Sequence, residues 1–158
     1  MISVASCSDD DGDDSIAPWH QTRWLVLSSW LFCLPAYLAY RKQRADLALL
    51  LGTASAISAN YWRCARPGWR RTLDLVYGKV AFVTLFGVWA GSLPSSPHAA
   101  GLVEASVYVP TTIGLYVLSA HTHRLAPWDH TWWRIHGLFH LCILYGQWRV
   151  LHGLPPSP

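Results

Sequence analysis

Two histidines near the C-terminus have the clearest potential for chemistry in this chain. His136 and His140 are four residues apart, so on a helix they share one face, and Gln147 continues the same stripe. Two imidazoles at this spacing can bind one metal ion. Alternatively, they can form hydrogen bonds to neighbouring helices. No further motif in the sequence requires a metal ion, so both interpretations stay open.

A second group combines Ser58 with Asp74. The Ser58 hydroxyl could bond to its own helix backbone or act as a nucleophile, although no base is adjacent in sequence. Asp74 could pair with Arg70 or Arg71 at a helix start, act as a base, or orient a metal-bound water. Two histidines and one carboxylate can form a catalytic zinc site with one open position. The candidate catalytic residues are therefore Ser58 and Asp74, and the candidate zinc ligands are His136, His140 and Asp74.

Two further polar groups allow a functional or a structural interpretation. Lys79 and Glu104 are charges placed inside apolar stretches, and they predict either a salt bridge between two helices or a proton or ion path. Three histidines lie close to Asp129 in a polar stretch, namely His121, His123 and His130. They could form a loose metal site, but solvated side chains at an interface are the favoured interpretation.

The composition indicates a membrane protein that positions these groups on helices. Over half of the 158 residues are hydrophobic and only 13% are charged, about half the usual share in soluble domains. The small net charge of +3 comes from arginines placed between apolar runs, which indicates membrane topology rather than nucleic-acid binding. Most of the ten tryptophans lie at the ends of these runs, as in the aromatic belts of membrane proteins.

The apolar runs predict an all-α polytopic membrane helix bundle with five spans. These cover residues 24–40, 47–62, 73–93, 99–120 and 132–151. The bundle domain is predicted over residues 19–153, between an acidic disordered tail at 1–18 and a proline-rich tail at 154–158. Five spans place the termini on opposite sides, and the balance of arginine and lysine favours an inside N-terminus.

Three local features refine this arrangement. Pro35 predicts a kink in the first span. The second span is rich in small residues, which predicts a position in the middle of the bundle. No two of the four cysteines form a Cys-x-x-Cys pair, and two of them lie in apolar runs, so a disulfide framework is not expected.

The segment Ser-Ala-Asn-Tyr-Trp at residues 58–62, followed by Asp74 and by His136-Gly-Leu-Phe-His140, resembles the superfamily of alkaline ceramidases and progestin/adipoQ-type receptors. The resemblance implies a membrane-embedded zinc protein, and several members are lipid amide hydrolases. By position it implies that Ser58 and Asp74 match the family's serine and aspartate, and that the two histidines match its paired zinc ligands. Trp62 stands where the family has a third histidine, and five spans replace the family's seven.

The sequence thus predicts a small multi-pass integral membrane protein, with a divergent or degenerate ceramidase-like lipid hydrolase as one candidate activity. The alternative is a non-enzymatic accessory or scaffold subunit of a larger membrane complex. The expected partners are the lipid bilayer and, for the alternative, other membrane-protein subunits, with no nucleic acid.

Overall fold

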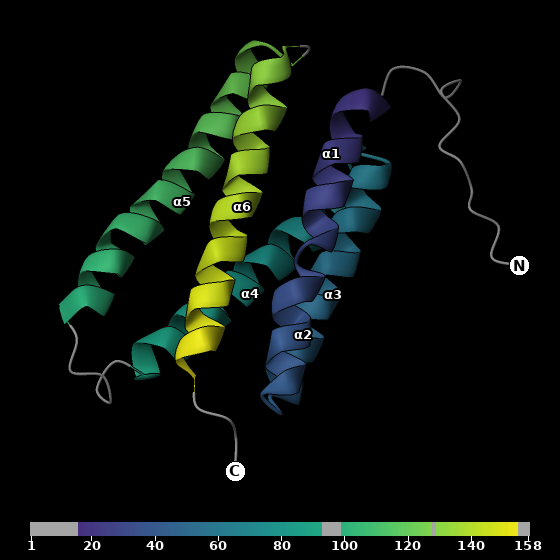
Figure 1. The fold of residues 1–158 in the computed structure, drawn as a ribbon. Helices are drawn as coiled ribbons and strands as arrows, with labels where there is room; N and C mark the ends of the chain where they lie inside the picture. The colour runs from purple at the N-terminus through teal and green to yellow at the C-terminus, as the bar shows by residue number, and fades with distance from the viewer. Residues whose placement is uncertain (1–15, 93–98, 128, 155–158) are drawn as a thin grey trace, which may run out of the picture.

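The computed structural model describes residues 16–92, 99–127 and 129–154, and all regular secondary structure in these ranges is helical. This confirms the all-α fold class. Figure 1 shows the helices in chain order, and their bounds are α1 (Trp19–Trp30), α2 (Cys33–Arg41), α3 (Ala45–Arg63), α4 (Trp69–Ser92), α5 (Ala99–Leu125) and α6 (His130–Gly153).

The first predicted span is divided into α1 and α2, and Pro35 explains the position of the break. A proline ring has no N–H to donate and its ring crowds the carbonyl four residues earlier. That residue is Leu31, which lies between the two helices. Across the break, Leu34 donates to the Leu31 carbonyl and Ala36 to the Phe32 carbonyl, so a tighter turn replaces the missing hydrogen bond.

Two helix ends lie outside the predicted bounds. Helix α4 begins at Trp69, before the predicted start at residue 73, so Arg70 and Arg71 belong to its first turn. Helix α5 continues to Leu125, beyond the predicted end at residue 120, so the connection to α6 covers only residues 126–129. Polar side chains do not end α5 early, since the Thr122 hydroxyl bonds to the carbonyls of Leu118 and Ser119 within the same helix.

The helices form two layers with α4 crossing behind them. Helix α3 packs against α1, α2 and α4, and α6 packs against α5, α1, α2 and α4. Figure 1 shows the α5–α6 pair beside the group of α1, α2 and α3, with α4 running obliquely behind α6. The small residues of the second predicted span are consistent with this position of α3, which contacts helices on both sides.

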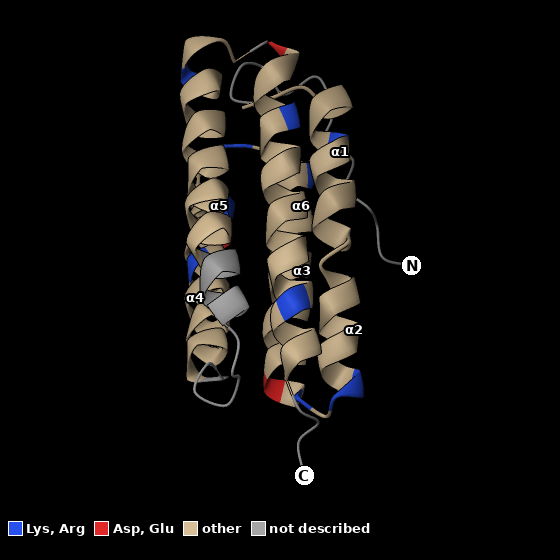
Figure 2. Ribbon diagram, turned by 60° about the vertical axis from the view of Figure 1, so that its left-hand side comes forward, with Lys and Arg blue, Asp and Glu red and all other residues tan. Residues whose placement is uncertain are grey.

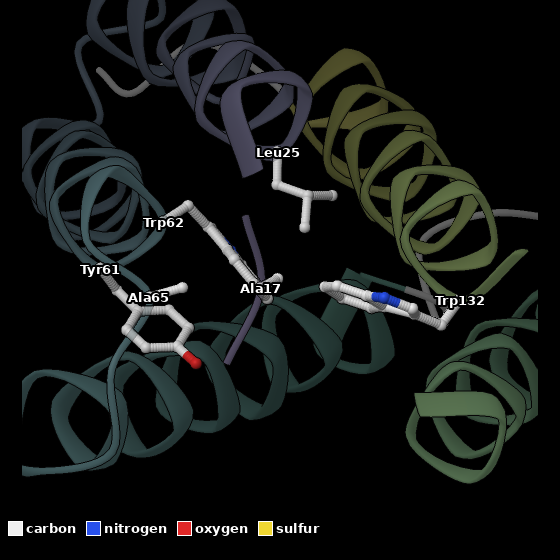
Figure 3. Close-up of a cluster of buried hydrophobic side chains, with 6 residues drawn as sticks. All are labelled: Ala17, Leu25, Tyr61, Trp62, Ala65 and Trp132. Atoms are coloured by element: carbon white, nitrogen blue, oxygen red, sulfur yellow. The ribbon is translucent and has the colours of Figure 1, made fainter. Parts of the chain in front are cut away.

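One buried apolar cluster closes the end of the bundle where α1 begins. It consists of Ala17, Leu25, Tyr61, Trp62, Ala65 and Trp132. Figure 3 shows Trp62 extending from α3 toward Trp132 of α6, with Leu25 of α1 above the two rings. The cluster therefore joins three helices that are distant in sequence.

Residues 16–18, which the sequence analysis placed in the disordered tail, pack on this cluster instead. Ala17 is buried, the Ile16 amide donates to the Ala65 carbonyl at 2.8 Å, and His123 Nε2 donates to the Ile16 carbonyl at 3.2 Å. Residues 1–15 of the predicted tail lie outside the described residues. At the other end, Leu154 is buried against the bundle, and 155–158 lie outside the described residues.

One of the described cysteines forms a disulfide, although the sequence did not predict a disulfide framework. Cys64 is disulfide-bonded, whereas Cys33 and Cys142 are free thiols. The absence of a Cys-x-x-Cys pair says nothing about cysteines that are distant in sequence and close in space.

Within the described residues, one helix is long and apolar enough to cross a membrane. The stretch is Trp69–Gly91 in α4, and only 11% of its apolar window is buried inside the bundle. Figure 2 shows that charged residues are few along the helices and that long stretches of α6 carry none. Large apolar side chains are exposed on several helices, for example Leu27, Val76 and Leu138.

Candidate functional site in the bundle cavity

A cavity of about 840 Å³ lies between α3, α4, α5 and α6. All four candidate residues from the sequence analysis line it, namely Ser58, Asp74, His136 and His140. Its remaining wall is largely apolar, with Phe82, Leu85, Ile113 and Ile143 among the lining residues. The structure thus brings together groups from three different helices around one space.

His140 is fixed by a serine of α1. Its Nδ1 lies 2.8 Å from Ser28 Oγ, and the Ser28 hydroxyl donates to the Leu25 carbonyl at 3.0 Å. Which of the two atoms donates depends on the imidazole tautomer.

His136 is held in the same way by a serine of α5. Its Nδ1 lies 3.0 Å from Ser119 Oγ, and the Ser119 hydroxyl donates to the Trp132 carbonyl at 3.4 Å. Both imidazoles therefore form the interhelical hydrogen bonds that the sequence analysis gave as the alternative to a metal site.

Ser58 and Asp74 contact each other, which the sequence did not indicate. The Ser58 hydroxyl donates a hydrogen bond to the Asp74 carboxylate, and Ser58 Oγ also lies 3.0 Å from Ser29 Oγ. The expectation that Ser58 bonds to its own backbone is therefore wrong. The expectation that Asp74 pairs with Arg70 or Arg71 is also not met, since no ion pair joins these residues in the described part of the chain.

Trp62 lies directly against the histidine pair. Its ring centroid is 5.0 Å from that of His136 and 6.4 Å from that of His140. The indole Nε1 is buried and has no hydrogen-bond partner among the described residues. An indole nitrogen can only donate, so Trp62 offers the cavity a donor and not a metal ligand.

The candidate zinc set is not assembled as a three-ligand group. The described residues contain no group of three or more His, Cys, Asp or Glu side chains arranged to hold a metal ion. Asp74 is engaged with Ser58, and Trp62 cannot supply a lone pair. The side chains in this arrangement do not form a three-ligand zinc site, and the assignment of His136, His140 and Asp74 as zinc ligands stays a prediction.

The remaining sequence predictions have different outcomes. Lys79 lines the cavity, but the Glu104 side chain lies outside the described residues, so the predicted pair remains a prediction. The loop histidines do not gather into one group. His123 bonds to the Ile16 carbonyl and packs on Trp132, whereas His130 lies against His20 at 6.0 Å between ring centroids.

The serines that position the histidines were not predicted from the sequence. Ser28 and Ser119 each stand in an apolar run, and small hydroxyl side chains in such runs often bond across helices. That signal identifies both as interhelical donors or acceptors, but it does not indicate which helix they contact.

Comparisons of this chain with protein-family models, with curated proteins and with solved structures found no match. The resemblance to the ceramidase superfamily therefore rests on the quoted residues alone.

Proposed function

We propose that this protein is a multi-pass membrane protein that binds one lipid-like molecule in its bundle cavity. The observation that carries the proposal is the cavity itself, which has an apolar wall and a polar group formed by Ser58, Asp74, His136 and His140. Pockets for small amphipathic molecules combine these two features.

The uncharged outer surface supports a membrane location. Residues 24–40, 47–62, 80–103 and 105–123 contain no Asp, Glu, Lys or Arg. Large apolar side chains are exposed on several helices, for example Leu27 (56%), Val76 (54%), Val117 (57%) and Leu138 (54%). Soluble monomers rarely expose apolar patches of this extent. Since little of the α4 window is buried, α4 differs from the core helix of a soluble protein.

Lipid retention by the purified protein tests the proposal. Gly78 lines the cavity, and a Cβ built at this position meets nothing within 4 Å. Gly78→Leu should therefore fill part of the cavity without a clash. Gly87 lies on the same helix with the same open surroundings but does not line the cavity, so Gly87→Leu is the matched control.

Native mass spectrometry of protein released from gentle detergent should show one bound lipid on wild type and on Gly87→Leu, and little on Gly78→Leu. Equal lipid on the two variants, or none on wild type, would reject the cavity as the binding site.

Hydrolysis of the bound lipid is a second candidate function, favoured by the hydrogen bond from Ser58 to Asp74. In this scheme Asp74 takes the Ser58 proton as Ser58 Oγ attacks a carbonyl carbon. The acyl group moves to Ser58, the leaving amine or alcohol takes up the proton, and water then releases the acid.

The test is release of fatty acid from a fluorogenic long-chain acyl amide. Wild type should release it, and Ser58→Ala should lose the activity while retaining lipid. No release by wild type that still binds lipid would reject hydrolysis and leave the non-enzymatic accessory subunit as the better account.

A further inference from the structure

Two buried polar atoms without partners line the cavity, and neither belongs to the group of Ser58, Asp74 and the histidines. They are Trp62 Nε1 and Gln147 Oε1. Trp62 is 5% exposed and Gln147 is 6% exposed, so both side chains are more than nine-tenths buried. A buried polar atom without a hydrogen bond destabilises the fold by about 1–3 kcal/mol. Such atoms beside a cavity indicate that a bound molecule supplies the partners.

The two atoms need hydrogen-bond partners of opposite kinds. The indole N–H of Trp62 donates, so it fits an acceptor such as a carbonyl oxygen. The amide oxygen of Gln147 accepts, so it fits a hydroxyl or an N–H group. Both protein groups are uncharged, and neither position calls for an ionic ligand.

Helix geometry sets the spacing between the two positions. Trp62 contacts the rings of His136 and His140. Gln147 follows His140 by seven residues and His136 by eleven on α6, which corresponds to two to three helical turns, or about 10–17 Å along the axis. Apolar residues, including Ile143 of α6, line the cavity as well.

We infer that the ligand is a long-chain molecule with a carbonyl oxygen bound by Trp62 and a hydroxyl group two to three helical turns away bound by Gln147. The inference rests on the proposed lipid binding and specifies the ligand class. Trp62 thus serves as a hydrogen-bond donor at the position where the family that the sequence resembles has a histidine.

The chain supplies matched controls for both positions. Trp133 Nε1 and Gln21 Oε1 are also buried without partners, but these side chains do not line the cavity. Trp133→Phe and Gln21→Leu therefore remove the same atoms from the same kinds of side chain elsewhere in the bundle.

The experiment measures equilibrium binding of two tritiated probes, methyl stearate and methyl 10-hydroxystearate, to the full chain in lipid nanodiscs, with empty nanodiscs as background. Wild type should bind the hydroxylated ester about two- to tenfold tighter, the range expected for one hydrogen bond. Gln147→Leu should abolish this preference and leave methyl stearate unchanged. Trp62→Phe should weaken both probes by a similar factor and keep the preference.

Gln21→Leu and Trp133→Phe should bind like wild type. Equal binding of both probes by wild type, or a preference that survives in Gln147→Leu, would overturn the assignment of the ligand class. Binding of neither probe by wild type, together with no lipid in native mass spectrometry, would instead reject the proposed lipid binding.

Discussion

The contact between α1 and α3 and the cavity between α3, α4, α5 and α6 differ in whether their polar atoms have hydrogen-bond partners. In the first, which we term the closed seam, Ser55 Oγ donates to the Ser29 carbonyl at 2.8 Å and Ser29 Oγ lies 3.0 Å from Ser58 Oγ. Ser29 and Ser55 are fully buried. Small side chains let the two helices approach closely, and hydroxyl groups bond across the contact.

The second region, which we term the open seam, holds the cavity. Large side chains line it from both sides, including Phe82 and Phe86 of α4 and Ile113 of α5. Two of its polar atoms, on Trp62 and Gln147, have no partner. The closed seam joins two helices directly, whereas the open seam is the space in which we propose that a lipid binds.

Ser55→Leu should give the largest loss of stability. The side chain has no exposed surface and its hydroxyl bonds to Ser29, so a larger group forces α3 away from α1. We expect a loss of about 2–4 kcal/mol in the free energy of unfolding, measured by thermal unfolding in one detergent. Thr53→Leu, at an exposed position of the same helix, should change stability little. Similar losses in both variants would contradict a closely packed seam.

Gly146→Ala should have the next largest effect. A Cβ at this position would collide with the Tyr108 side chain of α5, and we expect a loss of about 1–3 kcal/mol. Gly137 lies on the same helix with nothing within 4 Å of a built Cβ. Gly137→Ala should therefore be neutral or stabilise by up to about 1 kcal/mol, because alanine favours the helix.

A double variant tests whether Tyr108 and Gly146 are in direct contact. Tyr108→Ala combined with Gly146→Ala should be more stable than the sum of the two single losses predicts. Strict additivity in chemical unfolding would argue that Tyr108 and Gly146 are not in contact.

The smallest effect is expected at the surface pair of Arg44 and Asp46. Arg44 Nε and Nη2 donate to the two carboxylate oxygens at 3.0 and 2.8 Å, and this contact lowers the pKa of Asp46. A lowered folded pKa gives a contribution that is present above the unfolded pKa of about 3.9 and is lost as the pH falls through the folded value. The pair is largely exposed, so Asp46→Asn should cost less than about 0.5 kcal/mol at pH 7. A loss that persists at pH 2.5 would show a cause other than the charge.

The sequence predicted the helical fold because uncharged apolar runs separated by basic segments define the helices. Pro35 predicted a kink in the first span, but the exact break at Leu31 depends on the carbonyl that the proline ring crowds. The extension of α5 to Leu125 was not predicted. The Thr122 hydroxyl donates to the Leu118 carbonyl within the helix, and the polarity of the local sequence does not reveal this bond.

The candidate residues were predicted one by one, and the structure shows how they combine. Ser58, Asp74, His136 and His140 do line one cavity. Their partners were not predictable, because Ser28, Ser119 and Ser29 reach them from other helices and only the packing of α1 and α5 decides these contacts. The same holds for Gln147, whose place on the histidine stripe was evident but whose missing partner was not.

Photolabelling in nanodiscs tests directly whether a lipid binds in the bundle cavity. A diazirine-bearing fatty acid methyl ester should label Phe82 and Ile143, which line the cavity, in a saturable manner that excess methyl stearate suppresses. Labelling of Leu27 and Leu49, which are exposed and lie outside the cavity, should rise in proportion to probe and resist competition. Saturable labelling at the cavity residues alone is the predicted result. Proportional labelling at all four positions would contradict a lipid-binding cavity in this bundle.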